Sequence, residues 1–342
     1  MRDVSHCNNW FMNDSHILHR RTLLRCAMAG LALPLTAHAA PEAWPNQPIT
    51  LVIGFAKGSV SEVLASTLAE PMSRVMGQAV KVEMAEGKAG TQAAVRVAKS
   101  TDNHTLAIVM SNTLTVAKSV DPSLPYEPSR DLRPVAFTSE DAMVLVASAR
   151  EPSTASAAEF LATARIAGDK WQYGSQGTGS VGHLGMEFLG IKGGLKARHV
   201  PFNNGPQILD AIRAGQVHMG MVPVTLAKRS NGRMGGIKAV AVTSYGRNDL
   251  LPDVPTLHEA GVIGFDYRVW SAMVVPRRWS EAQVNYMVSV MERVLRDKEV
   301  DAKLRQQGVD IPSNITPAQV NREIVRETRL LGGIASIRNI AK

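Results

Sequence analysis

Short apolar runs alternate with amphipathic segments along most of the chain. The run at residues 49–55 predicts a buried strand, and residues 63–76 have apolar positions at helical spacing. A second strand at 79–83 and a third at 106–110 flank a predicted helix at about 91–100. This alternation of strand, loop and helix predicts a parallel sheet with helices on both faces.

A second alternation of strands and helices begins near residue 142. Its strands are predicted at residues 142–147, 171–174, 197–200, 217–222 and 239–243. Its helices are predicted at residues 156–167, from about Val181, and at 205–214. A strand at 269–275 is expected to return the chain to the first sheet, which amphipathic helices at 280–304 and 317–331 would cover.

This order of elements predicts an α/β fold of two lobes, the second inserted into the first. Lobe 1 comprises residues 41–145 and 266–342, and lobe 2 comprises residues 146–265. The chain is expected to cross between them near residues 143–150 and 262–270. Such a layout places a ligand in the cleft between two mixed sheets flanked by helices, and the cleft closes by a hinge motion.

The first 40 residues have the order of a bacterial export signal. A basic segment at 19–25 precedes an apolar run at 26–35 and the sequence Ala37-His38-Ala39-Ala40, which predicts cleavage near Ala39 or Ala40. The apolar run is too short to cross a bilayer as a helix. The pair Arg20-Arg21 leaves both the general export route and the twin-arginine route open. We therefore predict a periplasmic protein.

Composition narrows the classes of partner. The formal net charge of +8 falls to +6 without residues 1–40, which hold four arginines and two aspartates. A moderately basic protein suits anionic ligands or an anionic membrane surface. Aromatic residues make up 5%, without a Lys/Arg run, which argues against a nucleic acid partner. Both cysteines, Cys7 and Cys26, precede the predicted cleavage, so the rest of the chain has no disulfide or thiol chemistry.

The loop at residues 55–62 follows the first strand and opens a helix. Ligands of open α/β sheets lie at the carboxyl ends of strands, and the free amides of a helix N-terminus attract carboxylates. Gly58 permits close approach to the backbone. Ser59 and Glu62 also match a capping box, which leaves other amides of the first turn free for a ligand.

Residues 173–183 form a second glycine-bearing loop, which we expect to face the first. The motif Gly177-x-Gly179-x-x-Gly182 also matches a dinucleotide fingerprint. That fingerprint requires an acidic residue about 20 positions further on, where this chain has Arg198. We therefore assign the loop to an anion and expect no cofactor.

The sequence contains no clear catalytic set. Ser180 lacks the G-x-S-x-G frame because Thr178 occupies the first glycine position, and His183 is expected to line the cleft or cap its helix. The other histidines are scattered without ligand spacing, which argues against a metal site. We predict a binding protein and no enzyme; an exported hydrolase would require an acidic partner for Ser180 and His183.

Several motifs stand in the order and spacing of a known family. They are Phe55-Ala56-x-Gly58, Leu124-Pro125-Tyr126-x-Pro128, Tyr173-x-Ser175-x-Gly177-x-Gly179-Ser180, His199-Val200-Pro201-Phe202, Gly215-Gln216-Val217 and Leu251-Pro252-Asp253-Val254-Pro255-Thr256. From about Pro45 onward, the chain resembles the periplasmic solute receptors of tripartite tricarboxylate transporters, also called the Bug family. The resemblance implies a type II periplasmic-binding fold and a monomer that delivers a small organic carboxylate to membrane permease subunits.

The resemblance also implies that backbone amides of both glycine loops hold the ligand, often through ordered water. The expected ligand-binding residues are Phe55, Lys57, Gly58, Ser59, Val60, Ser61, Ser111, Ser175, Gly177, Thr178, Gly179, Ser180 and His183. An alternative within the same fold is a periplasmic sensor that acts on a signalling partner.

The chain departs from the family pattern in its loops. Lys57 stands where the family usually has proline in its first loop, and Lys88 lies in the loop after the second strand. The usual acidic residue after the Gly-Gln-Val strand is absent, since Met221-Val222 stands there. If both lysines face the cleft, they favour a more anionic ligand; as solvated loop residues they have no such effect.

Overall fold

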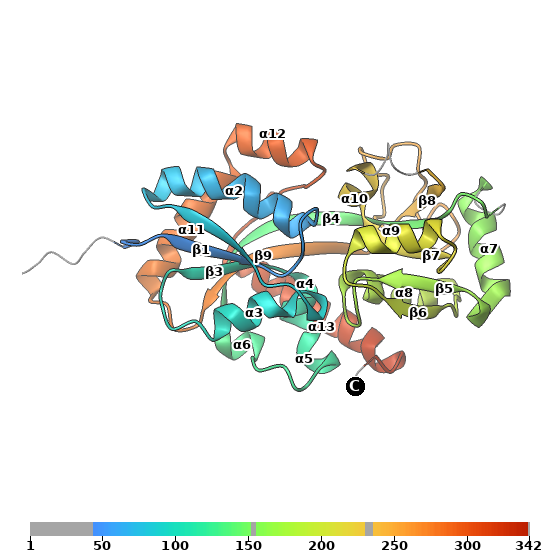
Figure 1. The fold of residues 1–342 in the computed structure, drawn as a ribbon, viewed down its shortest axis with the longest axis horizontal. Helices are drawn as coiled ribbons and strands as arrows, with labels where there is room; N and C mark the ends of the chain where they lie inside the picture. The colour runs from blue at the N-terminus through green and yellow to red at the C-terminus, as the bar shows by residue number, and fades with distance from the viewer. Residues whose placement is uncertain (1–43, 152–154, 230–234, 341–342) are drawn as a thin grey trace, which may run out of the picture. The chain divides into compact units, whose positions relative to one another are not determined.

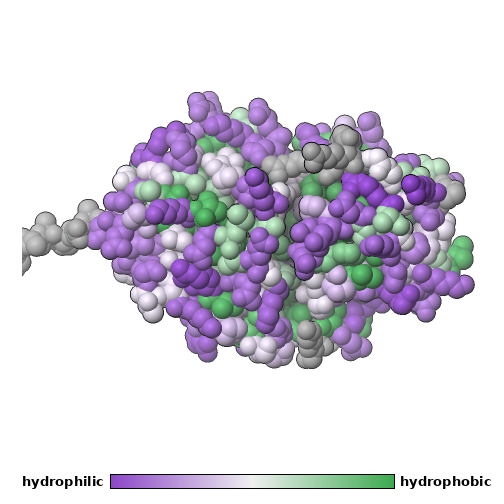
Figure 2. All heavy atoms as spheres, viewed as in Figure 1, coloured by the Kyte–Doolittle hydropathy of each residue, from purple (hydrophilic) through white to green (hydrophobic). Residues whose placement is uncertain are grey.

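The computed structural model describes residues 44–151, 155–229 and 235–340. The predicted export signal and its cleavage point lie outside these residues. Within them, no helix combines the length and apolar character needed to cross a membrane. The face shown in Figure 2 is largely hydrophilic, with apolar residues in small scattered groups.

The described chain alternates strands and helices throughout (Figure 1). The strands are β1 (Ile49–Ile53), β2 (Val80–Met84), β3 (Thr105–Met110), β4 (Leu132–Ser148), β5 (Gln172–Ser175), β6 (Arg198–Pro201), β7 (Met219–Pro223), β8 (Ile237–Val242) and β9 (Arg268–Pro276). The helices are α2 (Val60–Met76), η1 (Lys88–Gly90), α3 (Thr91–Ala98), α4 (Ser111–Thr115), α5 (Ala117–Val120), α6 (Pro128–Asp131), α7 (Ala157–Ala167), η3 (Gly168–Lys170), α8 (Val181–Gly193), α9 (Gly205–Arg213), α10 (Val224–Arg229), α11 (Glu281–Leu295), α12 (Lys298–Gln306) and α13 (Pro317–Ile337).

The strands form one mixed sheet in the order β2-β1-β3-β9-β4-β7-β5-β6, and β8 pairs with β4. β1 is parallel to β2 and β3, and β5 is parallel to β6 and β7, as expected for crossovers through helices. β9 and β4 run antiparallel to their neighbours. The sheet around β1, β2 and β3 was predicted to be parallel, but it also contains an antiparallel strand, because β9 pairs with β3 in the opposite direction.

Figure 1 shows two groups of helices along this sheet, with β4 and β9 between them. We use "first half" for β1–β3 with α2, α3, α11 and α12, and "second half" for β5–β8 with α7–α10. Each half has its own apolar core: one cluster contains residues of β1, β3, α2 and α11, and two others contain residues of β5, β7, β8, α8 and α9. The α/β architecture with helices around each half of the sheet matches the prediction.

Strand β4 joins the two halves. Its residues Leu132–Ala142 pair with β9, and Met143–Ser148 pair with β7 and β8. The sequence predicted only residues 142–147 as strand, because the preceding segment is polar. The hydroxyls of Thr138 and Ser139 are buried and lie 2.7 and 2.8 Å from the Ser271 hydroxyl of β9, which satisfies them inside the sheet.

Two further differences concern the C-terminal helices. The predicted single helix at 280–304 is two helices, because the Asp297 side chain accepts from the amides of Glu299 and Val300 and begins α12. Helix α13 extends beyond the first half, since Leu331 and Ile334 pack in a cluster with residues of α8. The C-terminal helix thus contacts both halves.

Candidate functional site

Two adjoining cavities lie where loops of the first half face loops of the second half. Both are lined by Phe55, Ala56, Gln176 and Asn204, so they are parts of one cleft. The centre of a water molecule has access to about 30 Å³ of the smaller cavity and about 710 Å³ of the larger one. The volume of the larger cavity is typical of sites for small molecules.

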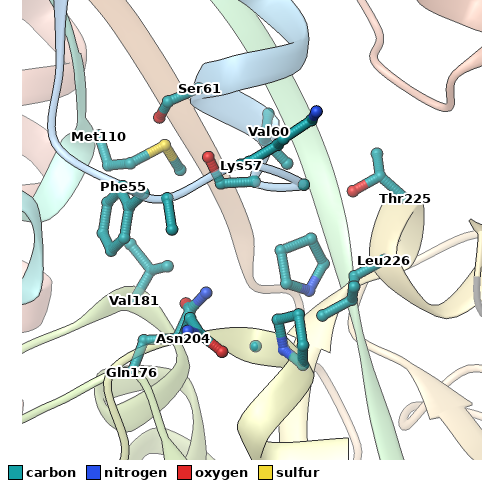
Figure 3. A pocket seen from close by; sticks show the side chains of 16 residues that line it. Phe55, Lys57, Val60, Ser61, Met110, Gln176, Val181, Asn204, Thr225 and Leu226 are labelled. Carbon is teal, nitrogen blue, oxygen red and sulfur yellow. The ribbon is translucent and has the colours of Figure 1, made fainter. Parts of the chain in front are cut away.

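The smaller cavity is lined from both halves of the molecule. Its lining comprises residues 55–61 and Met110 on one side and Gln176, Val181, Asn204, Gly205, Pro206, Pro223, Thr225 and Leu226 on the other. Figure 3 shows Phe55 and Val60 across this cavity from Asn204 and Leu226. The larger cavity adds residues 86–91, Asn112, Asp121 and Gly177–Gly179, with Asn203 and Gln207.

The first glycine loop presents its backbone to the smaller cavity. Ser59 is the N-cap of α2 and accepts from the amide of Glu62, and the Glu62 carboxylate accepts from the amide of Gly58. The first bond of the helical ladder is Val63 N–H to Ser59 C=O. The amides of Val60 and Ser61 precede it, so they are donors that a ligand can use.

Gly58 is required by the backbone of this loop. Its φ is +90°, and a Cβ placed there would meet nothing within 4 Å. The conformation, which side chains rarely adopt, therefore explains the glycine better than lack of space does. A sharp turn at this point brings the N-terminus of α2 to the cavity.

The second glycine loop is held mainly by its own polar groups. Ser180 is the N-cap of α8 and accepts from the amide of His183, and Nδ1 of His183 accepts from the amide of Gly179 at 3.0 Å. The Ser175 hydroxyl lies 2.6 Å from Nε2 of His199. Ser175, Ser180 and His183 are buried and line neither cavity, whereas Gly177, Thr178 and Gly179 line the larger one.

Two histidines lie behind this loop and are held neutral. The rings of His183 and His199 stack with centroids 3.8 Å apart. Burial lowers the pKa of His183 to about 4, and burial together with the neighbouring His183 lowers the pKa of His199 to about 3. A neutral His183 has a free Nδ1 lone pair, which agrees with its role as acceptor from Gly179.

The structure separates the other candidate residues. Phe55, Lys57, Gly58, Ser59, Val60 and Ser61 all line the smaller cavity. Ser111 is buried at the start of α4 and lines neither cavity.

The sequence reasoning predicted the helix α9 but not its place at the cleft, and it missed α10. Asn204 is the N-cap of α9, accepts from the amide of Gln207, and lines both cavities. Asn204 before Gly205-Pro206 is a recognisable helix-start signal, so α9 was detectable as a further helix N-terminus at the cleft. Thr225 and Leu226 carry no such signal.

Both lysines noted in the sequence reach the cleft lining. Lys57 lines the smaller cavity and Lys88 the larger one. Nζ of Lys88 lies 3.9 Å from Oδ2 of Asp121, which also lines the larger cavity. The charge of Lys88 is therefore partly balanced within the cleft.

The geometry offers little for catalysis. The Ser180 hydroxyl accepts from the backbone amide of His183, and the imidazole of His183 accepts from the amide of Gly179, so this serine and this histidine are not paired as nucleophile and base among the described residues. Ser175 and His199 are within reach of each other, but Ser175 is fully buried away from both cavities. No group of three or more potential metal ligands gathers among the described residues.

A cleft lined by glycine loops and helix N-termini from two halves of a mixed α/β sheet defines a solute-binding receptor with the two-lobed periplasmic-binding fold. A sequence profile described as "Tripartite tricarboxylate transporter family receptor" matches residues 64–339. The chain belongs to this family of receptors.

Known proteins agree with this assignment. The chain is 27% identical to Protein BugT of Bordetella pertussis over 311 residues, which cover 90% of this chain and 93% of that protein. MatC from Rhodopseudomonas palustris with bound malate has a TM-score of 0.77 and 28% identity, covering 85% of this chain and 99% of that one. Rpa4515 from R. palustris with adipate has a TM-score of 0.81 and 27% identity, covering 87% and 99%. The resemblance to the Bug family and the predicted fold class are confirmed.

Proposed function

We propose that this receptor binds a small organic carboxylate in the cleft and delivers it to the membrane permease of a tripartite tricarboxylate transporter. The observation that carries the proposal is the meeting of three helix N-termini, those of α2, α8 and α9, at one cleft. Helix N-termini carry a partial positive charge and unpaired amides, which stabilise a carboxylate. Malate and adipate in two similar structures are ligands of this class.

The proposed contacts follow from the geometry. Val60 and Ser61 line the smaller cavity, and their amides would donate to one carboxylate, with Lys57 nearby. Gly177, Thr178 and Gly179 would contact the remainder of the ligand in the larger cavity. Ser111, Ser175, Ser180 and His183 would act indirectly, because their burial places them behind the loops.

The lobes and the cellular location are part of the same proposal. Residues 41–145 with 266–342 and residues 146–265 would move as two lobes about β4 and β9 and enclose the ligand. The predicted export signal would place the receptor in the periplasm, where it would act as a monomer, as the family resemblance implies.

Thermal denaturation of residues 41–342 with mono-, di- and tricarboxylates tests the ligand class. A carboxylate at 100 times its Kd would stabilise the protein by about 2.7 kcal/mol and raise the Tm by several degrees. Gln176 lines both cavities, so Gln176→Trp should abolish the shift, whereas Trp at the exposed Gln216 should leave it intact. A shift with another solute class, and with no carboxylate, would contradict the proposal.

A further inference from the structure

Asn112 lies at the start of α4, at the carboxyl end of β3, and only 1% of it is exposed. Its side-chain nitrogen donates to the carbonyl of Ala89 at 3.2 Å and to the carbonyl of Gly179 at 3.1 Å. Ala89 belongs to the loop after β2, and Gly179 belongs to the second glycine loop. One buried amide therefore connects the two halves of the molecule at the larger cavity, which Asn112 also lines.

The chemistry of the two partners fixes how this amide is oriented. Carbonyl oxygens only accept hydrogen bonds, so the NH₂ group of Asn112 must face them. Its Oδ1 atom is buried without a hydrogen-bond partner in the described part of the chain. The side chain is therefore placed for its two donors, and the cost of the unsatisfied oxygen keeps the connection from being strongly favourable.

Both carbonyls belong to loops with unusual backbone conformations. Lys88 and Ala89 have φ of 47° and 55°, a region in which non-glycine residues are strained, and Gly177 and Gly179 have φ of 101° and 76°. Strained loops persist only where their surroundings hold them. The loops also come close together, since a Cβ on Gly177 would lie 3.9 Å from the Cβ of Ala89.

We propose that Asn112 is a positioning residue that sets the spacing of the two loops and so favours the closed cleft before a ligand arrives. This inference rests on the proposed function, because it assigns Asn112 to the same cleft. Opening the cleft breaks the bond to Gly179, while the bond to Ala89 stays within the first half. The bridge to Gly179 is therefore the contact whose loss shifts the receptor towards the open arrangement.

Asn112→Asp is the sharpest variant, since it preserves the size of the side chain and replaces the donor by a carboxylate oxygen facing two carbonyls. Thr113→Val is the matched control: Thr113 is the next residue of α4, is fully buried, and its hydroxyl has no partner among the described residues. The control removes a buried hydroxyl without touching the bridge.

The test measures the opening of residues 41–342 without ligand by double electron–electron resonance. Spin labels go on Lys81→Cys of β2 and Lys192→Cys of α8, both exposed, in a chain whose own cysteines precede residue 41. The parent and Thr113→Val should share the same short distances, and Asn112→Asp should shift the distribution to longer ones. Asn112→Ala, measured in parallel, should show a smaller shift in the same direction.

Three results would overturn the inference. They are unchanged distances in both Asn112 variants, an equal shift in Thr113→Val, and a parent chain that shows only the long distances. Because no ligand is added, these results are independent of whether the ligand is a carboxylate, which the thermal denaturation series tests separately. If Asn112→Asp does not fold, the Asn112→Ala distances decide the question.

Discussion

The two glycine loops of the cleft have similar local sequences but different roles. Each follows a strand, contains glycine at positive φ, and enters a helix capped by serine. The loop at residues 55–61 lies at the smaller cavity with free amides in the first turn of α2. The loop at residues 175–183 uses two serines and a histidine for internal hydrogen bonds. A shared local motif therefore predicts the helix cap but not which polar groups remain for a ligand.

The difference comes from what packs behind each loop. His199 of β6 stacks on His183 and contacts the Ser175 hydroxyl, so residues distant in the chain occupy the polar groups of the second loop. The first loop has Phe55 against Gly90, where a Cβ would lie 2.4 Å from the ring. Apolar packing of this kind leaves the backbone donors free.

The largest expected effect contrasts one glycine from each region. A Cβ on Gly182 would lie 2.7 Å from the carbonyl of Met221, which belongs to the backbone and cannot move aside easily. We expect Gly182→Ala to lower the free energy of unfolding by about 3 kcal/mol through overpacking. Gly58→Ala meets no atoms and should lose only about 1 kcal/mol through backbone strain. Urea unfolding measures both, and a larger loss for Gly58→Ala would reverse the assigned roles of the two glycines.

The buried histidines of the second loop predict a dependence of stability on pH. The pKa values of His183 and His199 are about 4 and 3 in the folded protein and about 6.5 when unfolded, so the unfolded state binds more protons between these values. The free energy of unfolding should therefore fall as pH drops below 6.5, by up to about 1.4 kcal/mol per pH unit for each histidine.

His183→Asn keeps an acceptor for Gly179 and removes one titrating group. Urea unfolding at several pH values should show a shallower loss for this variant than for the parent chain. Buried Asp141 and Glu327, whose pKa values burial raises to about 7, act in the opposite direction, so the difference between the two chains is the quantity to compare. Equal slopes in both chains would refute a neutral, buried His183.

Loss of the cap in the first loop should have a moderate effect on stability and a further one on binding. Ser59→Ala removes the acceptor of the Glu62 amide and should cost about 1 kcal/mol. Ser156→Ala at the N-cap of α7 removes an equivalent bond far from the cleft and is the matched control. Urea unfolding should give similar losses for both, whereas calorimetry with a carboxylate that raises the Tm of the parent chain should show weaker binding only for Ser59→Ala. Equal Kd values would place the first loop outside the site.

The smallest expected effect concerns charge. Lys57→Met should weaken binding of that carboxylate by about threefold at low ionic strength and have little effect at high ionic strength, because salt screens exposed charges. Lys88→Met should have a smaller effect, since Asp121 already balances Lys88. Calorimetry at two salt concentrations measures both, and an effect of Lys57→Met that persists in high salt would contradict a purely electrostatic role.

The positions of helices and strands could be predicted from the sequence where a local pattern of apolar residues marks them. The strands β1, β3 and β9 and the helix α2 lie where their apolar periodicity predicted them. The pattern failed at β4, because Thr138 and Ser139 are polar and their partner Ser271 is more than 130 residues away. A hydroxyl pairing of this range leaves no local signal.

The same limit applies to the cleft. The first glycine loop, predicted from strand, glycine and cap, lies at the smaller cavity in the structure. Ser175, Ser180 and His183 are buried by His199 and by neighbours from other strands. Their burial therefore cannot be predicted from the residues adjacent to them in the sequence. The contacts of Asn112 with Ala89 and Gly179 likewise arise only when three loops meet.

The pairing of β4 with β9 has a mechanical consequence. Eleven residues of β4, Leu132–Ala142, form a ladder with β9 that is interrupted by irregularities after Pro134 and Phe137, and the pairing with β8 has another after Leu145. A bulge interrupts the hydrogen-bond ladder locally, bends the strand and increases its twist. If one half rotates against the other, this pairing has to deform, because β4 and β9 both lie between the two halves, and the irregularities are the places where the ladder is already interrupted.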